Sequence, residues 1–151
     1  KNGKRFVIPL PDPAAGWFLD LQQLAFGSRF VLPVRSRRGE GDRPMESSTL
    51  NVACNRIHAA LLDKQTGLEA CRRFTPHDLR STARSHLSAL GVDIIVAERC
   101  LNHSLGGLVA VYDQHDYLTE RRAALDTWCA FLQACELGKG WNVVPMKKAR
   151  A

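Results

Sequence analysis

Apolar residues recur at intervals of three and four in three long stretches of the chain. This spacing is typical of helices that bury one face. We expect helices over Asp12–Phe26, over Ser48–Leu62 with Ser47 or Ser48 as the cap, and over Asp116–Glu136 with Asp116 as the cap. The side chains expected on the buried faces are Trp17, Leu21 and Leu24, then Leu50, Cys54, Ile57 and Leu61, then Leu118, Leu125, Trp128, Cys129 and Leu132.

A fourth helix is expected from Thr75 to about Leu90. Thr75 offers a capping hydroxyl, Pro76 suits the first helical position and Asp78 places a negative charge in the first turn. Gly91 is expected to end the helix in the left-handed conformation. One face carries His77, Arg80 and Arg84, and the opposite face carries Leu79, Ala83, Leu87 and Leu90. The helix therefore offers two cations and an imidazole on one side, which suits a phosphate.

The remaining segments are short. Lys1–Leu10 contains Asn2-Gly3, a tight hairpin turn, followed by a β-like run. Val92–Leu101 reads as a short apolar helix, and Leu108–Tyr112 as a helical turn that presents a tyrosine. The expected fold class is mainly α, with a small β-hairpin or sheet remnant near the N-terminus.

Composition narrows the class of protein. A chain of 151 residues with 45% hydrophobic residues fits one compact domain. No apolar run approaches the ~20 residues of a membrane span, and no signal peptide is present. The five cysteines form no C-x-x-C pair, which argues against a zinc site and a secreted disulfide framework and favours buried thiols in a reducing cytoplasm.

Charge favours an anionic partner. The net charge is +6 and the pI is near 9.4. Arg35–Pro44 is a loop with four arginines, which reads either as a flexible surface loop or as a segment that touches phosphates.

The motifs with chemical content are H-D-L-R at residues 77–80, L-N-H-S at 101–104, and Tyr112, nine residues after His103. This order and spacing resemble the catalytic domain of tyrosine recombinases, above all prophage-type integrases. The family pattern usually has glycine where this chain has Asn102, but asparagine also tolerates the left-handed region. The resemblance implies the DNA breaking-rejoining fold of that family. It also implies that residues 1–137 are the C-terminal part of the integrase catalytic domain, and that residues 138–151 are a tail that is flexible or packs on a neighbouring protomer.

The resemblance also implies a role for each residue. Tyr112 is the nucleophile that joins the DNA 3′-phosphate, and Arg80 is the second of two phosphate-clamping arginines. His77 acts in proton transfer, His103 donates a hydrogen bond to the phosphate, and Lys1 is the general acid in a hairpin turn. DNA contacts are expected from Lys1, Arg80, Arg43 and Arg84. No metal or other cofactor is required.

The family's first arginine belongs to a T-G-x-R-x-x-E-like box, which this sequence lacks. We therefore expect the chain to be truncated at its N-terminus and inactive alone. The complete protein is expected to be a cytoplasmic, bacterial or phage-encoded recombinase that integrates and excises DNA. Its expected partners are attachment sites, on which it forms a tetramer, and no membrane. The sequence does not reveal the DNA target, the preference for integration or excision, or accessory proteins.

Two other readings stay open. A non-enzymatic helical DNA-binding module explains the charge, but not the order of His77, Arg80, His103 and Tyr112. A metal hydrolase built on the five histidines lacks H-E-x-x-H and an acidic cluster. Each motif residue alone reads as an ordinary cap, ion pair or packed aromatic, and Tyr117 is a rival nucleophile that misses the family spacing.

Overall fold

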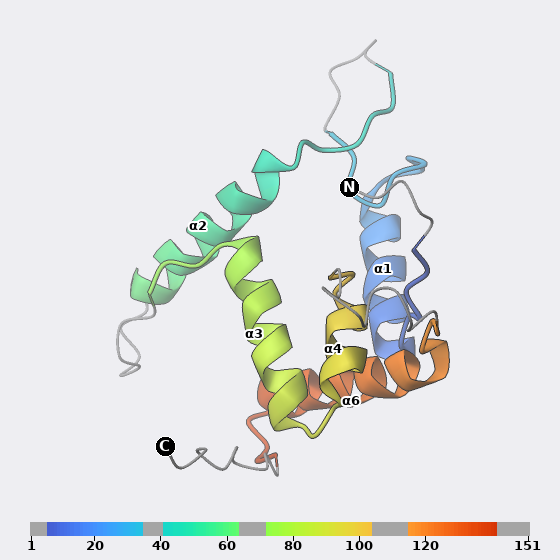
Figure 1. Cartoon of the computed structure of the whole chain (residues 1–151). Coiled ribbons are helices and arrows are strands. Elements are labelled where there is room, and N and C mark those ends of the chain that lie inside the picture. Colours follow the sequence, from blue (N-terminus) through green and yellow to red (C-terminus); the bar gives the residue numbers. More distant parts are fainter. Residues whose placement is uncertain (1–5, 35–40, 64–71, 104–114, 142–151) are drawn as a thin grey trace. The chain divides into compact units, whose positions relative to one another are not determined.

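The computed structural model of the chain describes residues 6–34, 41–63, 72–103 and 115–141 (Figure 1). Its helices in these residues are α1 (Asp12–Leu24), α2 (Ser48–Asp63), α3 (Pro76–Ala89), α4 (Ile94–Cys100) and α6 (Leu118–Glu136). None of these described helices is long and apolar enough to cross a bilayer. The expectation of a mainly helical chain is confirmed.

The β remnant stays a prediction. The turn at Asn2-Gly3 lies outside the described residues. Within the described ranges, β pairing is limited to an isolated antiparallel bridge between Pro33 and Pro44. Residues 6–10 have no strand assignment.

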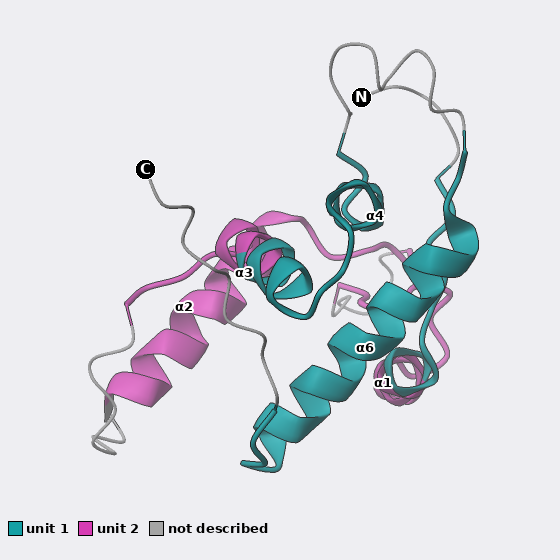
Figure 2. Ribbon diagram, turned by 60° about the horizontal axis from the view of Figure 1, so that its bottom comes forward, with its two compact units in different colours: residues 1–15, 82–151 teal, residues 16–81 magenta. Residues whose placement is uncertain are grey.

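The chain divides into two compact units, which Figure 2 shows in separate colours. Unit 1 comprises residues 1–15 and 82–151, and unit 2 comprises residues 16–81. The division falls inside α1 and inside α3, so each of these helices contributes residues to both units.

The core of unit 1 lies where α4 packs against α6 and the end of α3. Leu87 of α3 is 1% exposed, Ala97 of α4 is fully buried and Ala124 of α6 is 4% exposed. Small residues at the centre let the helices approach closely, and larger side chains close the edges. Val96 and Cys100 complete this buried cluster, and the partly buried side chains of Val92, Tyr117, Leu125 and Trp128 pack against it.

The start of α6 differs from the expectation. Tyr117, with φ of 53°, occupies the N-cap position, and its side chain makes no capping hydrogen bond. The prediction that Asp116 caps this helix was therefore wrong. The carboxylate of Asp116 instead accepts a hydrogen bond from Nη1 of Arg121 at 3.0 Å. The buried guanidinium draws this carboxylate away from the helix N-terminus.

Unit 2 is organised around Asp42. Its carboxylate accepts hydrogen bonds from Oγ of Ser28 at 2.6 Å and from the backbone N–H of Arg29 at 2.9 Å. These bonds depress the pKa of Asp42, the Ser28 hydroxyl most strongly. They hold the turn after α1 against the segment that follows residue 40.

Several predicted buried faces are exposed. Leu24 is 69% exposed and Ile57 is 53% exposed, whereas Cys54 is buried as expected. Helical spacing decides which residues share a face, but burial also requires another element to cover that face. The other side chains predicted to be buried but found exposed are Trp17, Leu50, Leu61 and Leu118.

Three of the four described cysteines are buried free thiols, as the sequence predicted. These are Cys54, Cys100 and Cys129, whereas Cys135 is exposed. Burial raises the pKa of the Cys100 and Cys129 thiols, which keeps them protonated and unreactive.

Candidate active site

The start of α3 is a reciprocal cap. The backbone N–H of Asp78 donates to Oγ1 of Thr75 at 3.3 Å, and the carboxylate of Asp78 accepts from the Thr75 backbone N–H at 2.9 Å. The Thr75 hydroxyl also donates to this carboxylate at 2.7 Å, and it is the main cause of the lowered pKa of Asp78. The predicted cap at Thr75 is confirmed, and it fixes where the helix begins.

His77 and Arg80 lie in the first turns of α3, and both are exposed. They are three residues apart, so their side chains leave the same side of the helix. An imidazole and a guanidinium on one exposed side of a helix can bind an anion such as a phosphate, because both donate hydrogen bonds and the guanidinium is positively charged.

The other end of α3 also follows the prediction. Gly91 has φ of 83°, and the backbone N–H of Val92 donates to the carbonyl of Leu87 at 3.0 Å. This left-handed turn ends the helix and leads into α4. Asp93 caps α4 by accepting the backbone N–H groups of Ile95 and Val96 at 2.8 and 3.4 Å.

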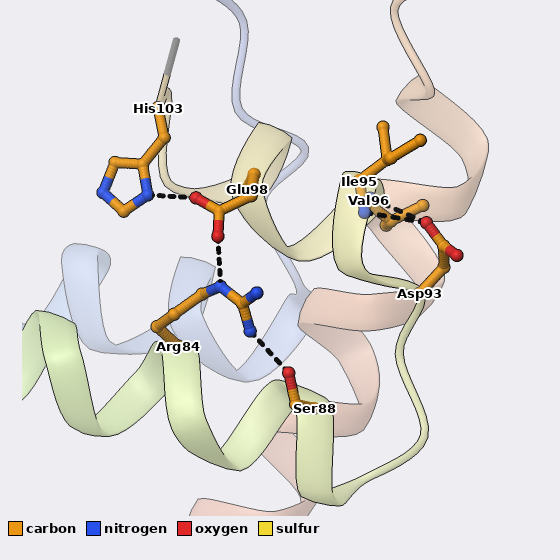
Figure 3. Close-up of polar contacts among 7 residues, drawn as sticks. All are labelled: Arg84, Ser88, Asp93, Ile95, Val96, Glu98 and His103. Carbon is orange, nitrogen blue, oxygen red and sulfur yellow. Dashed lines mark hydrogen bonds and ion pairs between the residues drawn. The ribbon is translucent and has the colours of Figure 1, made fainter. Parts of the chain in front are cut away.

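Glu98 of α4 bridges Arg84 of α3 and His103 (Figure 3). Its Oε1 accepts a hydrogen bond from Nε of Arg84 at 2.7 Å. Its Oε2 forms a hydrogen bond with Nδ1 of the His103 ring. Nη1 of Arg84 also donates to the hydroxyl of Ser88, one turn further along α3. One carboxylate thus joins a cation of one helix to the imidazole that follows the next helix.

This bridge is partly shielded from water. The side chains of Arg84, Glu98 and His103 are 21%, 25% and 39% exposed. The hydrogen bond from Arg84 is the main cause of the lowered pKa of Glu98, and that from His103 adds to it. Glu98 is therefore a carboxylate at neutral pH and acts only as a hydrogen-bond acceptor.

The backbone also fixes His103. The carbonyl of Glu98 accepts the backbone N–H of His103 at 3.0 Å and that of Leu101 at 3.2 Å. Asn102 lies between them with φ of 52°, so it adopts the left-handed conformation. The expectation that asparagine tolerates this backbone at the family's glycine position is confirmed. Glu98 thus holds both the backbone and the ring of His103.

The other residues predicted for the site lie outside the described residues or are not part of this bridge. Lys1 and Tyr112 lie outside the described residues. Arg43 is exposed in unit 2, where its carbonyl accepts the backbone N–H of Val34 at 3.0 Å. Tyr117 packs against the unit 1 core. Its ring contacts the His115 ring edge-on, with the two ring centroids 4.6 Å apart. The described structure therefore brings together Arg84 and His103, through Glu98.

Sequence reasoning missed Glu98. The local signal was an acidic residue inside the apolar run of residues 92–101. A partly buried acid requires a partner, but that partner, Arg84, lies fourteen residues away in the sequence. The described residues contain no group of three His, Cys, Asp or Glu that suits a metal ion.

Comparison with known proteins gives two findings. The model of the phage integrase family matches residues 1–118. The chain is also 28% identical, over 139 residues, to the protein named prophage integrase IntA of Escherichia coli (strain K12). That alignment covers 91% of this chain but 30% of the relative, so the chain spans about a third of the relative's length. No solved structure matches the chain significantly.

Proposed function

The chain belongs to the phage integrase family, and from this membership we propose that it acts in site-specific DNA recombination through a covalent phosphotyrosine intermediate. The observation that carries the proposal is that one family match spans the H-D-L-R and L-N-H-S motifs and Tyr112 together. The reciprocal cap of α3 and the bridge from Glu98 to His103 support it, because they hold residues of these motifs in defined places.

The reaction exchanges one phosphoester for another. The hydroxyl of Tyr112 attacks a backbone phosphorus of the DNA and gives up its proton, with His77 acting in that transfer. A bond forms between the tyrosine oxygen and the phosphorus, and the bond to the 5′-oxygen breaks. The product is a 3′-phosphotyrosine and a free 5′-hydroxyl strand. Attack by the hydroxyl of another strand reverses the step, so no external energy source is consumed.

The surrounding residues stabilise the charge and move the protons. Arg80 donates to the non-bridging phosphate oxygens, where negative charge grows during the reaction. His103 donates a further hydrogen bond to the phosphate, and His77 acts in proton transfer. Lys1 gives a proton to the leaving 5′-oxygen. Removing one donor aimed at developing charge raises such a barrier by about 3–4 kcal/mol.

Binding and assembly are part of the proposal. Arg43 adds contacts to DNA phosphates, whereas Arg84, also expected to do so, binds Glu98 and Ser88 and supports His103 instead. The complete recombinase acts as a tetramer on its attachment sites. The family's first arginine box is absent from the sequence. The chain by itself is therefore expected to bind DNA weakly and to cleave it poorly.

The test uses a nicked duplex that carries the attachment site and traps the cleaved state. The protein assayed has the chain preceded by a first-arginine box. A covalent protein–DNA complex should form, disappear in Tyr112→Phe and persist in the matched control Tyr117→Phe. DNA binding without any covalent complex would reject the proposal and favour the non-enzymatic DNA-binding module.

A further inference from the structure

We propose that Glu98 is a positioning residue that sets the orientation and the proton location of the His103 ring, so that its Nε2 atom faces the DNA phosphate. The inference rests on the proposed function, since it assigns His103 to the phosphate. The part of the inference that concerns the contact between Glu98 and His103 can be tested without DNA.

The carboxylate decides which ring nitrogen it binds. A carboxylate only accepts hydrogen bonds, and it lies against Nδ1 of His103, so Nδ1 must carry a proton. A neutral imidazole has one N–H, and here that hydrogen stays on Nδ1. To donate from Nε2 to a phosphate oxygen, the ring takes up a second proton, and the carboxylate of Glu98 balances the resulting positive charge.

Several contacts keep Glu98 in place for this task. Arg84 binds its other carboxylate oxygen at 2.7 Å, and Ser88 holds the Arg84 guanidinium in turn. The carbonyl of Glu98 accepts the backbone N–H of His103 at 3.0 Å. Glu98 therefore holds both the ring and the backbone of His103. This double attachment leaves the imidazole little freedom to rotate. The arrangement parallels other histidines that are oriented by a carboxylate on the nitrogen away from the reacting group.

The first test locates the ring proton in the chain without DNA. Nitrogen NMR of histidine-labelled protein, at about pH 8.5, distinguishes a proton on Nδ1 from one on Nε2. Wild-type His103 should carry a proton on Nδ1, and Glu98→Ala should move it to Nε2. Glu98→Gln keeps the side-chain size but offers one acceptor oxygen to the two donors, Arg84 and His103. We therefore expect the proton to be shared between Nδ1 and Nε2 of His103 in this variant.

Glu120→Ala is the matched control. It removes the same charge from a glutamate 50% exposed in α6, whose carboxylate lies 3.9 Å from Nε2 of His115. This change should leave the His103 proton on Nδ1. An unprotonated Nδ1 in the wild-type chain, or the same proton location in wild type and Glu98→Ala, would overturn the proposal.

The second test asks whether Glu98 acts through His103. In a protein that cleaves DNA, Glu98→Gln should slow covalent complex formation roughly 10- to 100-fold. In a His103→Ala background, the same change should cost less than about two-fold, because the group it positions is gone. Full additivity of the two changes would overturn the positioning role. Absence of cleavage in wild type would reject the proposed function while leaving the NMR result intact.

Discussion

Nη1 of Arg121 lies 3.0 Å from the carboxylate of Asp116, and the Arg121 side chain is 1% exposed. Its Nη2 donates to the carbonyl of Val7, and its Cζ lies 4.6 Å from the ring centroid of Phe6. One buried cation therefore joins three parts of unit 1: the N-terminal segment, the residue before α6, and α6 itself. We expect it to matter for the stability of the whole unit.

Arg121→Met should lower the free energy of unfolding by about 2–3 kcal/mol, because the Val7 carbonyl and the Asp116 carboxylate lose their charged donor. Urea unfolding followed by circular dichroism measures this change. Arg122→Met, at an exposed position of the same helix, is the control and should stay within about 0.5 kcal/mol of wild type. Equal losses in both variants would contradict the assigned role.

Leu87 and Leu79 of α3 make a matched pair. Leu87 is 1% exposed in the core, and Leu79 is 53% exposed. Leu87→Ala should destabilise the protein by about 2–5 kcal/mol, since it leaves a cavity. Leu79→Ala should change the stability by no more than about 0.5 kcal/mol. The comparison by thermal or urea unfolding fails if Leu79→Ala proves as costly as Leu87→Ala.

Asn102 is tested through its left-handed backbone, with φ of 52°. Asn102→Ala should cost about 1 kcal/mol, because a Cβ is strained in this region and alanine has no local polar contact to offset it. Asn102→Gly should stay within about 0.5 kcal/mol, because glycine adopts this conformation freely but loses more entropy on folding. An alanine variant as stable as the glycine variant would show that this residue does not keep its left-handed backbone.

The cap of α3 gives a local prediction. Thr75→Ala removes the hydroxyl that binds the Asp78 backbone N–H and carboxylate, and should cost about 1 kcal/mol. Thr82→Ala, at an exposed position inside the same helix, should be neutral or slightly stabilising because alanine favours helix. Urea unfolding of both variants checks this difference. If the two changes have the same effect, the hydrogen bonds of Thr75 add no stability.

The bridge at Glu98 predicts a dependence on pH. The folded protein holds the pKa of Glu98 below its usual 4.5, mainly through Arg84. As the pH falls, the unfolded chain therefore protonates Glu98 before the folded protein does. The stabilisation from the Glu98 carboxylate is fully present above the pKa of the unfolded chain and is lost as the pH falls through the lower pKa of the folded protein. The stability difference between wild type and Glu98→Gln should shrink as the pH falls from about 5 to 3. Urea unfolding at a series of pH values measures it, and a difference independent of pH would contradict the prediction.

Most helices of this protein could be predicted from the sequence, because residues within a few positions of each helix end determine where it begins and stops. Thr75, Pro76 and Asp78 at one end of α3, and Gly91 after the other, fix that helix through contacts within a few residues. The start of α6 was misjudged because the partner of Asp116 is the buried guanidinium of Arg121, whose environment the local sequence does not reveal.

The candidate site divides in the same way. The set His77, Arg80, His103 and Tyr112 was predicted from the sequence because its order and spacing resemble the tyrosine recombinase pattern. The role of Glu98 could not be predicted from the sequence, because it depends on α3 and α4 lying beside each other in unit 1.

The sequence by itself therefore determined the helical segments, their caps, and the residue types offered to a phosphate, since these follow from neighbours along the chain. Only the tertiary structure decided that Leu87 is buried while Leu79 is exposed, and that Arg84 and Glu98 meet beside His103. Burial and pairing between residues distant in sequence depend on which surfaces the fold brings into contact, and periodicity along one helix does not specify its partner.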